Sequence, residues 1–204
     1  MSAPTPLLAV LERARQLGVL GPGPVEDHVV HAQAFVDALA ALPGGSLVVD
    51  LGSGAGIPGL VVALARSDLR LVLVDAAERR TALLEEAVAA LGVQEQVQVV
   101  RGRAEVLGHQ DLWRQQAAAV TARSFGPPAV TAECAAPLLA VGGLLVVSEP
   151  PEQVDRWPAE ALAELGLEPQ PAGDDDTVRI LRQVSACPDR YPRRVGVPAK
   201  RPLF

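Results

Sequence analysis

The chain has 204 residues, of which 49% are hydrophobic, and a formal net charge of −6. This size supports one substantial core and favours a single domain with modest additions. No apolar run approaches the roughly 20 residues of a membrane-spanning helix, and the first residues lack the basic flank of a secretory signal. The two widely separated cysteines, Cys134 and Cys187, have no clustered histidine beside them. They predict reduced thiols, no metal site and a cytoplasmic location.

Charge is distributed unevenly along the chain. Residues 151–176 carry eight acidic side chains and one basic one, whereas residues 188–204 carry five basic side chains against one acidic. The negative net charge of the chain argues against a generally basic nucleic-acid binder, but a local basic segment can still bind phosphates. On charge alone, an RNA contact and a solvated tail are equally good interpretations of the basic residues, which are Arg190, Arg193, Arg194, Lys200 and Arg201.

Two helical segments come first in chain order. Leucines at helical spacing predict a helix over residues 5–20, and the Gly21–Pro24 run then breaks the chain. Residues 25–42 form a second expected helix. Its two histidines, His28 and His31, are interpreted as helix-surface or domain-contact residues rather than metal ligands, because no further ligand lies nearby in the sequence.

From residue 47 onward, short β-rich runs alternate with helices. Strands are expected at 47–51, 71–75, 97–101, 117–121, 144–148 and 177–184, and helices at 60–66, 78–91, 130–139 and 155–166. This alternation predicts parallel βαβ units with right-handed crossovers. The expected fold is therefore a Rossmann-like α/β domain with a mostly parallel central sheet flanked by helices. We expect a helical N-terminal extension at 1–45, the cofactor-binding domain at 46–187 and a basic tail at 188–204.

A glycine-rich loop follows the first predicted strand. Glycine permits positive φ and lets a ligand approach the backbone without a Cβ in the way. The helix that opens beyond the loop offers free N–H groups to an anionic or carboxylate-bearing ligand. A tight strand-to-helix turn alone needs one glycine rather than three. The loop therefore predicts a nucleotide-type cofactor site in the stretch Asp50-Leu51-Gly52-Ser53-Gly54-Ala55-Gly56-Ile57-Pro58-Gly59.

Two cofactor classes compete for this loop. Gly54, Gly56 and Gly59 satisfy the dinucleotide pattern, with Asp75 near the expected distance at the end of the next strand. Asp75 serves either cofactor, because its two oxygens accept both ribose hydroxyl protons. Asp50 discriminates, since a carboxylate beside the loop repels a pyrophosphate and favours the ammonium and sulfonium of S-adenosylmethionine. The charge at Asp50 therefore predicts a methyl donor rather than a nicotinamide cofactor.

Two further loops, at residues 102–105 and 121–128, follow predicted strands and so reach the same edge of the sheet. Residues 102–105 could read an adenine edge through their backbone, or could be a plain loop with a surface glutamate. Arg123 could bind the cofactor carboxylate or a substrate phosphate, and could equally be an ordinary surface charge. Residues 124–128 could wall an acceptor pocket or simply connect two elements.

The chain resembles the ribosomal RNA small subunit methyltransferase G family, also called glucose-inhibited division protein B, over residues 25–204. The resemblance is carried by the glycine loop, by residues 102–105 and 121–123, and most specifically by the ending Arg190-Tyr191-Pro192-Arg193-Arg194-Val195-Gly196-Val197-Pro198-Ala199-Lys200-Arg201-Pro202-Leu203. It implies a class I methyltransferase that uses S-adenosylmethionine to methylate N7 of a guanine in 16S ribosomal RNA. Ribosomal RNA or the small ribosomal subunit would then be the partner. The implied cofactor contacts are Gly52, Ile57, Ala104, Glu105 and Arg123.

The implied reaction needs no general base, and departures from the family pattern leave other functions open. Guanine N7 attacks as a neutral lone pair and loses no proton, so the reaction requires alignment rather than a general base, and we expect no catalytic residue. His31 lacks the family's following Leu-Asp-Ser element, and Ser148-Glu149-Pro150-Pro151 stands where the family has Lys-Gly. The alternatives are a divergent paralogue that methylates a small molecule or another macromolecule, and a cofactor-binding protein without turnover.

Overall fold

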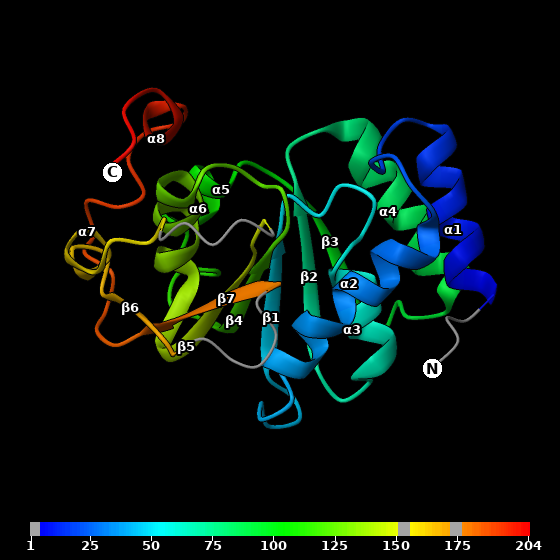
Figure 1. Ribbon diagram of the computed structural model, residues 1–204, viewed down its shortest axis with the longest axis horizontal. Helices are drawn as coiled ribbons and strands as arrows, with labels where there is room; N and C mark the ends of the chain where they lie inside the picture. The colour runs from blue at the N-terminus through cyan, green and yellow to red at the C-terminus, as the bar shows by residue number, and fades with distance from the viewer. Residues whose placement is uncertain (1–4, 151–155, 172–176) are drawn as a thin grey trace.

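A seven-stranded sheet forms the centre of the molecule and carries helices on both faces (Figure 1). This computed structural model describes residues 5–150, 156–171 and 177–204. The sheet has the order β3-β2-β1-β4-β5-β7-β6, parallel from β3 to β5 and antiparallel at β7. The strands are β1 (Leu47–Leu51), β2 (Arg70–Asp75), β3 (Val97–Arg101), β4 (Ala117–Ala122), β5 (Leu139–Ser148), β6 (Leu167–Pro169) and β7 (Val178–Gln183).

Helices α1 to α4 lie on one side of the sheet and α5 to α8 on the other (Figure 1). Among the described residues, no helix combines the length and apolarity that a membrane crossing requires. The helices are α1 (Thr5–Gln16), α2 (Val25–Ala38), α3 (Gly59–Ala65), α4 (Glu78–Leu91), α5 (Ala104–Leu107), α6 (Pro128–Ala135), α7 (Ala159–Ala163) and α8 (Val197–Lys200), with a 3₁₀ turn at Ala136–Leu138.

The two faces of the sheet bury two separate hydrophobic cores. Side chains alternate along each strand, so Leu71 and Leu73 of β2 pack with α1 to α4, whereas Val72 and Val74 pack on the face of α5 to α7. Helices α1 and α2 contribute fully buried side chains, among them Phe35, to the first core. Parallel strands covered on both faces are apolar throughout, which explains the continuous apolar runs of the sequence.

The predicted Rossmann-like α/β fold is confirmed, with differences at element ends. The helix expected over 25–42 ends at Ala38, because Arg66 donates hydrogen bonds to the carbonyl oxygens of Leu39 and Leu42, 2.8 Å each. The helix expected over 130–139 gives way at Ala136 to a 3₁₀ turn that contains Pro137, a residue without an N–H for a helical bond. Three short elements were not predicted, namely α5, β6 and α8.

Two expectations reach beyond the described residues. The late helix expected at 155–166 is observed only as α7, and its first residue lies outside the described part of the chain. Residues 151–155 and 172–176 of the acidic stretch, and Pro151 of the departure from the family pattern, also lie outside it. The division into a 1–45 extension, a 46–187 domain and a tail remains a prediction.

Candidate functional site

The glycine loop joins β1 to α3, and its glycines have different roles. Gly56 has a φ of +92°, and a Cβ there would lie 2.3 Å from Cδ1 of Leu60, so the fold itself requires glycine. Gly54 has a φ of +54°, but a Cβ there would meet nothing closer than the Gly52 carbonyl oxygen at 3.7 Å. The space beside Gly54 is therefore open to a ligand.

Asp75, at the end of β2, is bound to this loop. Its Oδ2 accepts a hydrogen bond from the Gly54 N–H at 3.1 Å, and its Oδ1 accepts one from the Ala77 N–H at 2.9 Å. Arg80 forms an ion pair with the same carboxylate at 3.6 Å. Each carboxylate oxygen keeps a further lone pair, so Asp75 can fix the loop and still accept a ligand hydroxyl.

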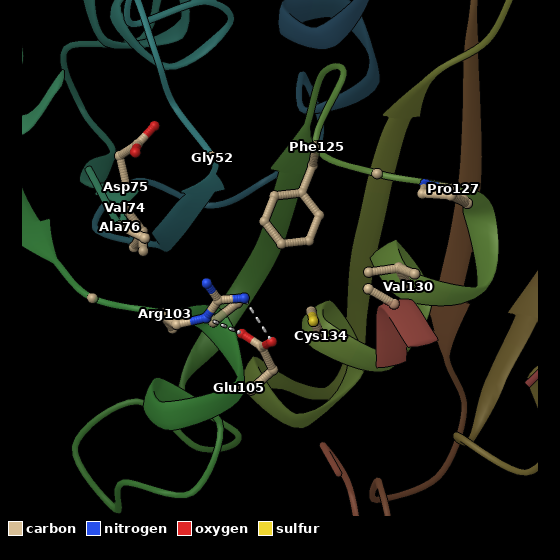
Figure 2. Close-up of a pocket in the computed structure, with 14 residues that line it drawn as sticks. Gly52, Val74, Asp75, Ala76, Arg103, Glu105, Phe125, Pro127, Val130 and Cys134 are labelled. Carbon is tan, nitrogen blue, oxygen red and sulfur yellow. Dashed lines mark hydrogen bonds and ion pairs between the residues drawn. The ribbon is translucent and has the colours of Figure 1, made fainter. Parts of the chain in front are cut away.

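A cavity of about 290 Å³ opens at the carboxyl ends of β1 to β4. Figure 2 shows Asp75 at one side, the Phe125 ring reaching in from the loop after β4, and the Arg103–Glu105 pair and Cys134 on the remaining sides. Burial raises the pKa of the Cys134 thiol to about 12, so this sulfur is a protonated wall atom. The cavity is lined by Gly52, Val74, Asp75, Ala76, Gly102, Arg103, Ala104, Glu105, Phe125, Gly126, Pro127, Val130, Cys134 and Ala199.

Glu105 is, with Asp75, one of two buried carboxylates in this cavity. Its Oε1 accepts hydrogen bonds from Arg103 Nη2 at 3.1 Å and from the Gly196 N–H at 3.0 Å. Burial alone would raise the pKa of the Glu105 carboxyl, but these hydrogen bonds outweigh it and hold the pKa below its usual value. Glu105 is thus an ionised group that is already paired.

A second polar group lies beside the glycine loop, at the ends of the neighbouring strands β1 and β4. Asp50 is buried, and its Oδ1 accepts a hydrogen bond of 2.6 Å from the Thr121 hydroxyl. Burial raises the pKa of the Asp50 carboxyl to about 6, although the Thr121 hydrogen bond and the Arg123 charge act in the opposite direction. Arg123 Nη2 donates a hydrogen bond of 2.5 Å to Nδ1 of His28 in α2, so this histidine makes a contact with the domain.

Two atoms of this polar group have no hydrogen bond of normal geometry, although the Gly59 N–H at the start of α3 is close enough to the Asp50 carboxyl to lower its pKa. Asp50 Oδ2 and Arg123 Nη1 are buried without a hydrogen-bond partner among the described residues. Burial lowers the pKa of the Arg123 guanidinium, against the effect of the Asp50 charge. Buried polar groups are nearly always hydrogen-bonded in folded proteins, so an acceptor and a donor left open on adjacent strands indicate a ligand that carries both complements.

The predicted cofactor residues fall into two sets. Four of the nine line the cavity, namely Gly52, Asp75, Ala104 and Glu105. The remaining five lie outside the lining. Asp50 and Arg123 form the adjoining polar group, and Ile57 is a core residue that could meet a ligand only through its backbone. The five outside the lining are Asp50, Gly54, Gly56, Ile57 and Arg123.

Two lining residues could not be found from sequence patterns. Cys134 and Ala199 come from α6 and α8, which carry no ligand-binding motif. Phe125, Gly126 and Pro127 belong to the loop for which the sequence left open a pocket wall or a simple connector, and they line the cavity. The sequence indicated these three residues only through their position after a predicted parallel strand, because ligands bind beyond the carboxyl ends of such strands.

The basic tail divides into bound and exposed cations. Arg193 forms an ion pair of 2.6 Å with Glu133, whose side chain is 0% exposed. Arg190 lies over the Tyr191 ring, 5.0 Å from its centroid, but its side chain is 65% exposed. The other three predicted RNA contacts, Arg194, Lys200 and Arg201, are also exposed.

Glu149, which stands at the position of the family's Lys-Gly element, is paired inside the protein. Its Oε2 accepts a hydrogen bond of 2.6 Å from Arg156 Nη2, and its Oε1 accepts one from the Trp157 indole N–H. The negative charge at this position is therefore balanced by a neighbouring arginine.

A family model described as rRNA small subunit methyltransferase G matches residues 25–159. A protein of that name from Deinococcus deserti is 38% identical over 185 residues, which cover 83% of this chain and 75% of that protein. The namesake from Deinococcus radiodurans is 36% identical over 213 residues, covering 97% of this chain and 83% of that protein. The chain belongs to the rRNA small subunit methyltransferase G family.

Membership of the rRNA small subunit methyltransferase G family confirms the resemblance seen in the sequence, and the chain is a methyltransferase. Among solved structures, the antibiotic-resistance methyltransferase Kmr is similar with a TM-score of 0.56. The two share 19% identity, and the match covers 75% of this chain and 93% of that one. This likeness shows the shared fold.

Proposed function

We propose that this family member uses S-adenosylmethionine to methylate N7 of a guanine in small-subunit ribosomal RNA. The observation that carries the cofactor half is the pair of unsatisfied atoms, Asp50 Oδ2 and Arg123 Nη1. A free amino-acid group has an ammonium for the first and a carboxylate for the second, and the methionine part of S-adenosylmethionine has both. A dinucleotide has neither an ammonium nor a carboxylate to offer.

The cavity beside these atoms fits the nucleoside part of the same cofactor. Asp75 would accept the ribose hydroxyl protons through its remaining lone pairs, as a carboxylate at the end of β2 does in nucleotide-binding sheets. The backbone at Ala104 and Glu105 would read the adenine edge, and the Gly52–Gly54 backbone would approach the chain between the two. When bound, S-adenosylmethionine supplies the methyl group, which passes to the N7 lone pair while sulfur keeps the electron pair of the broken bond.

The substrate half rests on the names of the relatives and on the exposed cations. The curated relatives are named for the small-subunit ribosomal RNA. Arg194, Lys200 and Arg201 are exposed on the segment whose Ala199 lines the cavity, so they would hold phosphates near the transferred methyl group. A neutral N7 nucleophile needs positioning rather than deprotonation, which these residues and the Phe125 loop would provide. With ribosomal RNA as substrate, we propose the cytoplasm as the location.

The test is labelled-methyl transfer to small ribosomal subunits from a strain that lacks this protein. Wild-type protein should label one guanine of the ribosomal RNA, located by nuclease digestion and mass spectrometry. Arg123→Met should weaken S-adenosylhomocysteine binding in calorimetry by roughly 10- to 100-fold, because a charged hydrogen bond is removed. Arg15→Ala, which removes an exposed ion pair on α1, is the matched control and should bind normally.

The outcomes separate the proposal from its alternatives. Binding of S-adenosylhomocysteine without labelling of RNA would support a paralogue with another acceptor or a protein without turnover. Failure of S-adenosylhomocysteine to bind wild-type protein would overturn the cofactor assignment itself.

A further inference from the structure

We propose that residues 190–203, which supply Ala199 to the wall of the cofactor pocket, are latched there by the Arg193–Glu133 ion pair, so that cofactor affinity depends on this latch. The inference rests on the proposed function only in taking the cavity beside Gly52 and Asp75 as the cofactor pocket. It gives Arg193 a positioning role in place of the RNA contact expected from the sequence.

The latch is the most extensively bonded ion pair of the C-terminal segment. Oε1 of Glu133 accepts hydrogen bonds from the Arg193 backbone N–H and from its Nε, 2.8 Å each, and Oε2 accepts one from Nη2 at 2.6 Å. The same Nη2 also donates to the Arg201 carbonyl oxygen at 2.7 Å. Glu133 is fully buried in α6, so a buried carboxylate would lose its bidentate partner if the segment left.

A second set of contacts anchors the chain just before the latch. Arg114 donates to the carbonyl oxygens of Tyr191 at 2.9 Å and Cys187 at 2.8 Å. His109 Nε2 lies 2.6 Å from the Pro192 carbonyl oxygen. A Cβ on Gly108 would lie 2.8 Å from the Pro192 ring, so this glycine allows the segment to pack closely. These contacts fix the segment on the loop that follows α5.

Arg193 of the latch is connected to the pocket by two residues that follow it at three-residue intervals. Gly196, three residues beyond Arg193, has a φ of +78° and donates its N–H to Glu105 in the cavity wall. Ala199, three residues further, lines the cavity itself. The segment therefore supplies one wall residue and one of the two residues that donate hydrogen bonds to Glu105, and Arg193 fixes the start of this short run.

A wall that can dock and undock must be coupled to the ligand that it encloses. If the pocket is complete only when the segment is docked, the latch raises cofactor affinity, and by reciprocity the bound cofactor stabilises docking by the same factor. Loss of a purely structural ion pair elsewhere in the fold would lower the stability of the protein without changing its affinity for the cofactor.

The first test compares S-adenosylhomocysteine affinity in two arginine variants by calorimetry. Arg193→Ala should weaken binding at least about fivefold, within the usual range of coupling between sites, and Arg193→Lys should recover part of the loss. Arg66→Ala is the matched control, because Arg66 makes a comparable set of hydrogen bonds. It lies between the end of α3 and the start of β2, at the amino ends of the strands and away from the cavity. The control should bind as the wild type does, even where its melting temperature is lower.

The second test does not require the latch variant to fold. Saturating S-adenosylhomocysteine should slow the tryptic release of peptides after Arg194 and Lys200 in the wild-type protein by about fivefold or more. The release is followed by mass spectrometry.

A further variant, Ala199→Phe, narrows the cavity from an exposed position. It should weaken S-adenosylhomocysteine binding while the melting temperature of the free protein is retained.

Equal affinity of wild type and Arg193→Ala, or release of these peptides at an unchanged rate when the ligand is bound, would overturn the latch while leaving the methyl-donor site intact. Failure of the wild type to bind S-adenosylhomocysteine would instead refute the proposed function on which the latch depends.

Discussion

The glycine loop and the C-terminal segment meet at one cavity, but they are built in opposite ways. The loop is made by a contiguous stretch whose backbone conformation is set by its own glycines, and Gly56 takes a φ of +92° there. The C-terminal segment is held by side chains from distant parts of the chain, such as Glu133 for Arg193 and Arg114 for the Tyr191 carbonyl oxygen. One half of the site is determined by local conformation, the other by long-range ion pairing.

This difference determines how each half should fail. A change in the loop acts on the backbone and on the core beneath it, so it should cost folding energy directly. A change in the exposed part of the C-terminal segment should leave the fold intact and act on charge. Three variants rank these effects from the largest to the smallest.

The largest loss of stability is expected for Gly56→Ala. The new Cβ would lie 2.3 Å from Cδ1 of the buried Leu60, at a φ that favours glycine. Overpacking and backbone strain together should lower the free energy of unfolding by about 2–4 kcal/mol in urea. Gly54→Ala is the control, with no atom nearer than 3.7 Å to its Cβ, and should cost about 1 kcal/mol. Equal losses would show that the two glycines share one role.

An intermediate effect, of opposite sign, is expected for Asp50→Asn. Burial raises the pKa of Asp50 from 3.8 to about 6, so between these values the folded protein holds a proton that the unfolded chain releases. Wild-type stability should therefore fall as pH rises from about 4 to about 6, by up to ~3 kcal/mol from this group. The variant should lack this decrease and unfold at higher urea concentration at pH 8, while binding S-adenosylhomocysteine less tightly. An unchanged pH profile would contradict the burial argument.

The smallest effect on stability is expected for the exposed cations. Replacing Arg194, Lys200 and Arg201 together by alanine should change the free energy of unfolding by no more than about 0.5 kcal/mol. The salt dependence of RNA binding should flatten, by about 0.7–0.9 in the log–log slope for each phosphate that the protein no longer neutralises. Arg190→Ala offers a comparison within the segment, because this side chain is also exposed but its guanidinium lies over the Tyr191 ring, so its loss should change the salt slope less. A slope unaffected by the triple variant would remove these three residues from the RNA interface.

The same contrast explains what the sequence could predict. Strands β1 and β3 and helix α4 follow the expected boundaries, because buried strands and a helix closed by Gly92 leave local patterns. The glycine loop and Asp75 are equally local signals. The Glu133–Arg193 pair joins residues from α6 and the tail, and nothing in either stretch indicates the other.

Short elements and side-chain directions also escaped prediction. Helices α5 and α8 have 4 residues each, too few to produce a period that could be recognised. The charge of Asp50 could be read from the sequence, but its burial against Thr121 depends on β4 lying beside β1, which is a property of the assembled sheet.

The arginine clamps have a consequence for chemical labelling. Arg66, Arg114 and Arg193 each bind several carbonyl or carboxylate oxygens at once, a task that suits a planar guanidinium better than an ammonium. Lys200 is the single lysine of the sequence, and it is exposed next to Ala199 on α8. Among side chains, an amine-reactive dye would thus modify one place, and its emission would report whether the neighbouring pocket is filled.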